Sequence, residues 1–115
     1  MTSIHMGIGK QEMVLVLKGH AGYKKGDDIV CSALSVLGQA AVSTVMDMQK
    51  DYGVHAKVTI EPGLLKLIAQ YPEKMQTEME SRMMLAKNGF LMLELSYPEH
   101  VKCYFLAVQT KKYGM

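Results

Sequence analysis

Apolar and polar positions follow two different periods along the chain, and each change of period marks a new element. Residues 2–6 suit a short strand, and residues 7–10 suit a turn. Residues 11–18 form an apolar, β-branched run between turn signals, which is typical of a strand buried on both faces. We expect these two strands to form a hairpin.

A helical period begins after the next polar stretch. Asp28 is a good N-cap, because its carboxylate can accept hydrogen bonds from the backbone N–H groups of Val30 and Cys31. A helix should therefore begin at Ile29, as the central helix of roughly residues 28–51. The apolar residues at helical spacing are Leu34, Leu37, Ala41, Val45 and Met48.

Strict alternation returns at residues 54–61, which indicates a strand. Pro62 and Gly63 suit the two central positions of a type II turn, since proline presets the first φ and glycine accepts the positive second φ. Residues 64–71 should return as the partner strand.

The last third of the chain predicts one helix and one strand. Pro72 is tolerated at the first position of a helix, which should continue through Gly89, at a cost of about 1 kcal/mol, and end before Pro98. The stripe at helical spacing comprises Met75, Met79, Arg82, Ala86, Phe90, Leu93 and Tyr97. Residues 100–110 are interpreted as the final strand, followed by a short tail. One face of this strand would carry Val101, Cys103, Phe105 and Ala107.

The predicted order is strand, strand, helix, strand, strand, helix, strand, within a single domain that comprises residues 1–115. Hairpins with helices packed on them predict an α+β fold. The sheet should be mostly antiparallel, with about five strands and two helices.

Composition and charge narrow the function classes. The hydrophobic content of 49% is ordinary for a globular domain, and we expect no segment that approaches the roughly 20 apolar residues of a membrane span. The start of the sequence lacks the features of a secretory signal, so a cytoplasmic location is expected. With a net charge of +2 and scattered lysines, direct nucleic acid binding is not expected. The eleven methionines are predicted mainly to fill gaps in the core.

Residues 18–35, which read KGHAGYKKGDDIVCSALS, concentrate the reactive chemistry. His20 lies at the end of a predicted strand, and Cys31 lies in the first turn of the predicted helix. The free N–H groups and the dipole of a helix start favour a negatively charged sulfur, which is the nucleophilic form. The loop can fold back to bring imidazole and thiol together, which predicts a cysteine nucleophile for acyl transfer.

Four neighbours would support such a site. Gly19 and Gly22 allow a sharp backbone turn, whose free amides would stabilise an oxyanion. Asp28 is either a plain cap or a partner that orients His20, because its charge near the cysteine opposes thiolate formation. Ser35, one helical turn after the cysteine, either donates a hydrogen bond near the site or bonds its own backbone.

The same spacing is equally compatible with a structural interpretation. Cys31 would then be a small buried hydrophobe, and His20 would be a loop residue bonded to a backbone carbonyl. Cys103, on an apolar strand face, is expected to be structural, and both thiols are expected to be free. Neither cysteine has metal-ligand spacing with a histidine, so neither a metal nor another cofactor is expected.

The combined pattern of GHA at residues 19–21, a glycine-containing loop, and DIVC with a serine four positions later resembles the ribosomal-processing cysteine protease family Prp (YsxB-like). The resemblance implies that His20 is the general base and Cys31 the nucleophile. It also implies supporting roles at its other recurrent positions, which are Gly19, Asp28 and Ser35. A mobile, substrate-gating loop is implied for Gly22, Tyr23, Lys24, Lys25, Gly26 and Asp27.

The resemblance further implies a cytoplasmic, homodimeric endopeptidase. Its partner would be a ribosomal protein precursor of the large-subunit L twenty-seven type, from which it removes a short N-terminal extension. Two alternatives stay open on the sequence alone. One is a non-catalytic, ribosome-associated binding module, which has no need to keep both His20 and Cys31. The other is a phage-encoded relative that processes a phage protein.

Overall fold

The computed structural model describes residues 1–26 and 28–105. Its elements follow the predicted order, with one additional short 3-10 helix. They are β1 (Thr2–Ile8), β2 (Glu12–Gly19), α1 (Ile29–Met48), β3 (His55–Glu61), β4 (Leu64–Gln70), the 3-10 helix η1 (Glu73–Met75), α2 (Gln76–Ser96) and β5 (Val101–Phe105). The α+β prediction is confirmed.

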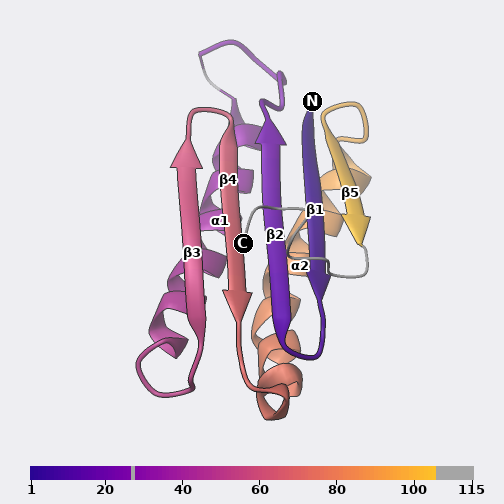
Figure 1. Cartoon of the computed structure of the whole chain (residues 1–115). Coiled ribbons are helices and arrows are strands. Elements are labelled where there is room, and N and C mark those ends of the chain that lie inside the picture. The colour runs from indigo at the N-terminus through magenta and orange to yellow at the C-terminus, as the bar shows by residue number, and fades with distance from the viewer. Residues whose placement is uncertain (27, 106–115) are drawn as a thin grey trace.

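The strands form one five-stranded sheet in the order β3-β4-β2-β1-β5. Both predicted hairpins are present, because β1 pairs with β2 and β3 pairs with β4 in antiparallel fashion. β2 and β4 are also antiparallel, whereas β5 runs parallel to β1 along the far edge. The sheet is therefore mixed and mostly antiparallel. Both helices cover the same face of it (Figure 1).

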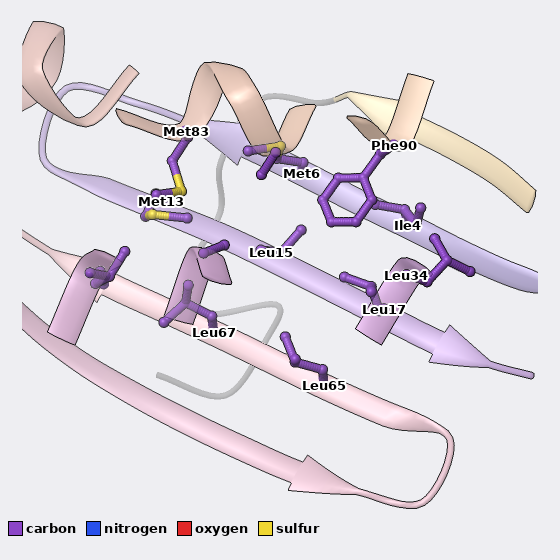
Figure 2. Packing of buried hydrophobic residues seen from close by; sticks show 14 of the residues in the cluster. Ile4, Met6, Met13, Leu15, Leu17, Leu34, Leu65, Leu67, Met83 and Phe90 are labelled. Carbon is purple, nitrogen blue, oxygen red and sulfur yellow. The ribbon is translucent and has the colours of Figure 1, made fainter. Parts of the chain in front are cut away.

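The main core lies between this face and the helices. Alternate residues of the central strands point into it, including Ile4 and Leu15, and Phe90 of α2 packs over them with no exposed surface (Figure 2). Full burial of one such side chain stabilises the fold by about 1.5–3 kcal/mol. The buried methionines that fill gaps in this core are Met6, Met13, Met48, Met79 and Met83. The core-filling prediction is confirmed for these five, whereas Met84 and Met92 are exposed.

The central strand β2 is buried on both faces, as predicted. Val14 and Val16 point away from the helices and form a second, smaller cluster with Ile68 of β4. A strand that is apolar on both faces must be covered on both of them. The continuous apolar run of β2 therefore suits the central place that it has in the sheet.

Two helix boundaries differ from the predicted ones. α1 ends at Met48 rather than near residue 51, because the backbone tightens as the N–H of Gln49 donates to the carbonyl of Met46 at 3.2 Å. Pro72 precedes the second helical segment instead of opening it. Its ψ of 144° is extended, and its carbonyl accepts the N–H of Met75 at 2.8 Å, which closes the 3-10 turn.

The second helix continues through Gly89, as predicted. A Cβ at this position would lie 2.7 Å from Cδ1 of Leu37, so the glycine lets α1 and α2 approach closely. Within the described residues, the final strand predicted over residues 100–110 is present as β5 (Val101–Phe105). The rest of the predicted range, including Ala107, and the tail lie outside the described residues.

α1 bears on the expectation that no segment approaches the length and hydropathy of a membrane span. By length and composition alone this helix, with a mean hydropathy of 1.8, is long and apolar enough to cross a membrane. One face of it packs in the protein core, however, through Val30, Leu34, Gly38, Ala41, Val45 and Met48. A helix that covers a sheet in this way passes the same test of length and composition, so this finding is weak evidence for a span.

A buried tyrosine closes the end of the sheet opposite the candidate site. The hydroxyl of Tyr71 lies 2.7 Å from the carbonyl oxygen of Gly9 and 2.9 Å from that of Glu12. Burial, together with the nearby carboxylates of Glu12 and Glu80, raises the pKa of Tyr71 well above its ordinary value. The hydroxyl therefore stays protonated and holds the β1–β2 turn.

Candidate functional site

The candidate residues gather at one end of the sheet. There the end of β2, the start of α1 and the turn between β3 and β4 lie together (Figure 1). The strand order explains this arrangement, because β4 lies beside β2 and so brings its own turn next to the end of that strand. The N–H of Gly19 donates to the carbonyl of Gly63 at 2.8 Å and ties the two segments.

Asp28 begins α1 and also anchors the preceding loop. One carboxylate oxygen accepts the backbone N–H of Cys31 at 2.9 Å, which confirms part of the predicted cap. The other oxygen accepts the N–H of Tyr23, also at 2.9 Å. These bonds, chiefly the one from Cys31, lower the pKa of Asp28 below its ordinary value. The carboxylate therefore remains charged while it joins loop and helix.

Cys31 lies in the first turn of α1 and is half-buried. The backbone N–H of Ala21 points at its sulfur, with 3.2 Å between nitrogen and Sγ. A donor aimed at sulfur stabilises the thiolate more than the thiol, as does the positive end of the helix dipole. Two features of the local backbone therefore favour the nucleophilic form, and the charge of Asp28 opposes it.

His20 is exposed and rests against the turn between β3 and β4. Its Nε2 lies 3.0 Å from the point that a Cβ on Gly63 would occupy, so any larger residue there would displace the ring. Within the described chain, no hydrogen bond joins the imidazole to Cys31. The two side chains line the same pocket, and in enzymes without substrate such catalytic contacts are often long.

This pocket has a volume of about 240 Å³ and is open to solvent. Its apolar lining comes from Leu17, Leu34, Ile60, Leu64 and Leu65, and its polar lining includes Gln39 and Glu61. Ser35 also lines it and accepts a hydrogen bond from Gln39 at 2.8 Å, so its hydroxyl belongs to the pocket wall. Of the predicted supporting residues, Gly19 and Ser35 line the pocket, whereas Asp28 acts through Cys31 and Tyr23.

Gly19 and Gly22 both adopt positive φ values, of 97° and 67°, as a sharp turn requires. A Cβ on Gly19 would collide with the carbonyl oxygen of Met1. Two amides of this turn are already engaged, since Gly19 donates to the β3–β4 turn and Ala21 donates to sulfur. An oxyanion would therefore have to compete for them or use another donor.

The loop that follows is exposed at residues 22–26, and Asp27 lies outside the described residues. The ring of Tyr23 packs edge-on against the rings of Tyr97 and His100, with centroid distances of 5.3 and 5.5 Å. The side chains of Lys24 and Lys25 are exposed. One tyrosine and one aspartate thus hold this part of the loop against the body of the protein.

A family model described as cysteine protease Prp matches residues 1–102. The chain belongs to the Prp family. It is accordingly a cysteine protease, and the non-catalytic alternative is set aside. A search of curated proteins found no match.

Solved structures support the fold of this Prp-family chain. A ribosomal processing protease Prp from S. aureus, in complex with a covalently linked product peptide, superposes with a TM-score of 0.65 at 14% identity. That match covers 92% of this chain and 100% of the other. A structure of the S. aureus protease with a substrate peptide has a TM-score of 0.62 at 13% identity, with the same coverage. SMU.848 from Streptococcus mutans has a TM-score of 0.67 at 22% identity and covers 94% of this chain and 96% of its own.

Four residues at the site of this Prp-family chain were missed or assigned no role by sequence reasoning. Ala21 donates to the sulfur, and His100 bonds the carbonyl of Ala21 at 2.9 Å. Gly63, noted only for its turn, seats His20, and Gln39 binds Ser35 inside the pocket. The one available signal was positional: Gln39 lies one helical turn after Ser35 and two after Cys31, on the same face of α1.

Cys103 has the structural surroundings that its apolar strand face predicted. Its thiol donates to the carbonyl of Phe90 at 3.5 Å, and its backbone N–H donates to Glu94 at 2.6 Å. Burial, reinforced by the charge of Glu94, raises the pKa of Cys103 to about 11. Both cysteines are free. In the described part of the chain, no three His, Cys, Asp or Glu side chains are grouped to hold a metal ion.

Proposed function

We propose that this chain is an endopeptidase that removes the N-terminal extension of a large-subunit ribosomal protein precursor of the L twenty-seven type. In this proposal Cys31 is the nucleophile and His20 is the general base. One observation carries the assignment: the sulfur of Cys31 accepts an N–H from Ala21 at the mouth of a pocket that His20 also lines. The S. aureus protein, described as a ribosomal processing protease, supports the substrate class.

The chemistry needs only these two side chains and water. The imidazole of His20 takes the thiol proton, and the sulfur of Cys31 attacks the scissile carbonyl carbon. The C–N bond then breaks, and His20 gives the proton to the leaving amine. Water, deprotonated by His20, attacks the thioester, which releases the carboxylate product and restores the thiol. For the first transfer the exposed ring of His20 turns from Gly63 toward the sulfur.

The supporting residues take distinct parts in this scheme. Gly19 shapes the turn that carries His20, and Asp28 fixes the helix start beneath the sulfur. Ser35 lines the pocket with Gln39. The apolar lining suits an apolar side chain beside the cut bond, and the 22–27 loop admits the substrate peptide.

We also propose that the enzyme acts in the cytoplasm as a homodimer. Support for a dimer comes from the outward side of the helices, where apolar side chains stay exposed and two of them, Val36 and Met92, line an apolar groove. The exposed fractions are 68% at Val36, 68% at Met92 and 84% at Leu95. A second copy that covered this surface would remove it from water. Sedimentation of wild type and Val36→Glu tests this, since the substitution should shift a dimer toward monomer.

The enzymatic proposal is tested by incubating the purified protein with the ribosomal protein precursor of its host and weighing the products by mass spectrometry. Wild type should release one N-terminal peptide, and Cys31→Ala should release none. His20→Ala should lower turnover by about 10²–10⁴-fold, the usual contribution of a general base. Cleavage of a phage protein and not of the ribosomal precursor would overturn the substrate and leave the chemistry standing.

A further inference from the structure

His100 lies next to the site although it is 80 residues after His20 in sequence. It follows α2 and directly precedes β5, and its Nδ1 is 2.9 Å from the carbonyl oxygen of Ala21. A carbonyl oxygen can only accept, so Nδ1 must carry the proton of this hydrogen bond. The ring is half-buried and thus partly shielded from competing water.

The residue that His100 holds is the one that contacts the sulfur. Ala21 is almost fully buried, at 1% exposure, and its backbone is bonded on both sides. Its carbonyl accepts from His100, and its N–H donates to Sγ of Cys31 at 3.2 Å. Because Gly22 follows with a φ of 67°, the chain turns away immediately afterwards. The N–H of Ala21 shares its peptide plane with the carbonyl of His20, which accepts the amine of Met1 at 2.6 Å, so Met1 and His100 together hold Ala21 through its two adjoining peptide planes.

His100 is itself well anchored. Its backbone carbonyl accepts the N–H of Thr2 at 2.9 Å, and its own N–H donates to the carbonyl of Tyr97, also at 2.9 Å. The ring of Tyr23 packs edge-on against both Tyr97 and His100. These contacts hold the exposed loop that carries Tyr23 against the edge of the sheet and the end of α2.

We propose that His100 is a positioning residue for the nucleophile. It fixes the backbone of Ala21 so that the N–H of Ala21 stays aimed at the sulfur of Cys31 and stabilises the thiolate. The inference rests on the proposed function in one respect, namely that the thiolate of Cys31 is the reacting group. His100 does not touch the substrate or the sulfur in this scheme.

The test compares His100→Phe, which keeps an aromatic ring and removes the donor, with His100→Asn, which keeps an N–H donor. His55→Phe is the matched control, because His55 is exposed on edge strand β3. The readout is the rate of alkylation of Cys31 by iodoacetamide as a function of pH, followed by mass spectrometry with Cys103 as the internal reference. Melting temperature is measured on the same samples.

His100→Phe should slow alkylation of Cys31 at neutral pH by about tenfold, because the N–H of Ala21 is then free to turn away and the sulfur loses one hydrogen bond. His100→Asn should recover much of the rate, and His55→Phe should match wild type. An unchanged profile for folded His100→Phe would overturn the inference, whatever its melting temperature. If His100→Phe does not fold, a profile of His100→Asn that equals that of wild type supports the donor role, and a slowed one refutes it.

The two proposals fail separately. If wild type cuts no ribosomal precursor and the alkylation profile still shifts in His100→Phe, the function is wrong and the positioning role stands. If wild type cuts the precursor and His100→Phe alkylates like wild type, the positioning role is wrong and the function stands.

Discussion

Cys31 and Cys103 are both half-buried free thiols beside a carboxylate, that of Asp28 and that of Glu94, yet only Cys31 accepts a backbone N–H at its sulfur in the described structure. The sulfur of Cys31 accepts from the N–H of Ala21, whereas the thiol of Cys103 donates to the carbonyl of Phe90. Cys103 also faces the carboxylate of Glu94, which adds to the effect of burial on its pKa. A donor favours a negative sulfur, and a carbonyl beside a carboxylate favours the neutral thiol.

The difference shows that partial burial does not decide whether a cysteine is reactive. Both side chains pack against the same core cluster. What separates them is their place in the fold: Cys31 stands in the first turn of a helix beside an open pocket, and Cys103 stands on a strand beneath α2. The identity and orientation of the neighbouring polar groups then set the chemistry.

The largest expected effect comes from exchanging each cysteine for alanine. Cys31→Ala should reduce cleavage of a precursor peptide by on the order of 10³-fold or more, because the proposed nucleophile is lost. Cys103→Ala should stay within about threefold of wild type, since it removes only a thiol distant from the pocket. Initial rates from chromatography of the cut peptide measure both. Comparable losses in the two variants would erase the contrast.

The two thiols of the wild type should differ next in alkylation. At neutral pH a thiol with a pKa of about 11 is almost entirely protonated. Cys31, whose sulfur accepts the N–H of Ala21 beside an open pocket, should therefore react much faster with iodoacetamide. The rate at Cys103 should rise about tenfold per pH unit until it levels near pH 11.

The raised pKa of Cys103 also makes the free energy of unfolding depend on pH. The contribution of its protonated form is complete below the ordinary value of 9.0 and is lost as pH rises through about 11.

In the alkylation experiment, peptide mapping by mass spectrometry measures the labelling of Cys31 and of Cys103 in one sample. Equal and slow labelling of both thiols would contradict the assignment of Cys31.

Asp28→Ala should have a smaller effect on the reactive side of the comparison. It removes the acceptor for the N–H groups of both Tyr23 and Cys31, so the melting temperature should fall. Asp28→Asn keeps one acceptor oxygen and loses the other, so its stability should lie between those of wild type and Asp28→Ala. Asp47→Ala, at an exposed position late in α1, is the control.

The lowered pKa of Asp28 predicts an acid dependence. The stability that its carboxylate contributes is present above its ordinary value of 3.8 and is lost as pH falls through the lower value of the folded state. Thermal melts across acidic pH should show this loss in wild type and not in Asp28→Asn. Identical acid profiles would mean that the carboxylate charge plays no part in the cap.

Glu94→Gln should have the smallest effect and should act on Cys103 alone. The amide oxygen can still accept the N–H of Cys103, so stability should change by only about 0.5 kcal/mol. Without the carboxylate charge the thiol of Cys103 should alkylate a few-fold faster at a given pH, because burial, the larger cause of its raised pKa, remains. The same labelling assay, with exposed Glu99→Gln as control, measures it. A change at Cys31 would contradict the independence of the two sites.

Local patterns were enough to predict the strands, the helices and their order. The Asp28 cap, the Pro62–Gly63 turn and the helix through Gly89 each depend on contacts within a few residues or on one helical stripe. The parallel pairing of β5 with β1 was not predicted, since it joins strands about a hundred residues apart. Pro72 was predicted to be the first helical residue, but it is the cap that precedes the 3-10 turn. Its extended ψ goes with that turn, which the local sequence pattern did not indicate.

That His20 and Cys31 lie at one pocket could be predicted from the sequence, whereas the contacts around them could not, and their roles stay a prediction. His20 and Cys31 follow from spacing and a helix start, and the cap that holds Cys31 spans only three residues. The contacts that orient the pair are longer in sequence: Ala21 reaches Cys31 across 10 positions and His100 across 79. The seat of His20 on Gly63 requires β4 to lie beside β2, which only the assembled sheet determines.

The hydrogen bond from His100 to Ala21 also bears on when the site can form during synthesis. Because a ribosome extends the chain from its N-terminus, His20, Ala21 and Cys31 emerge long before His100 does. The strand that follows His100 must then reach the edge beside β1 before the bond can close. A nascent chain that still lacks its last described strand therefore carries the proposed nucleophile, Cys31, without the bond from His100 to Ala21. The hydrogen bonds around the sulfur of Cys31 can therefore be complete only after β5 has paired with β1.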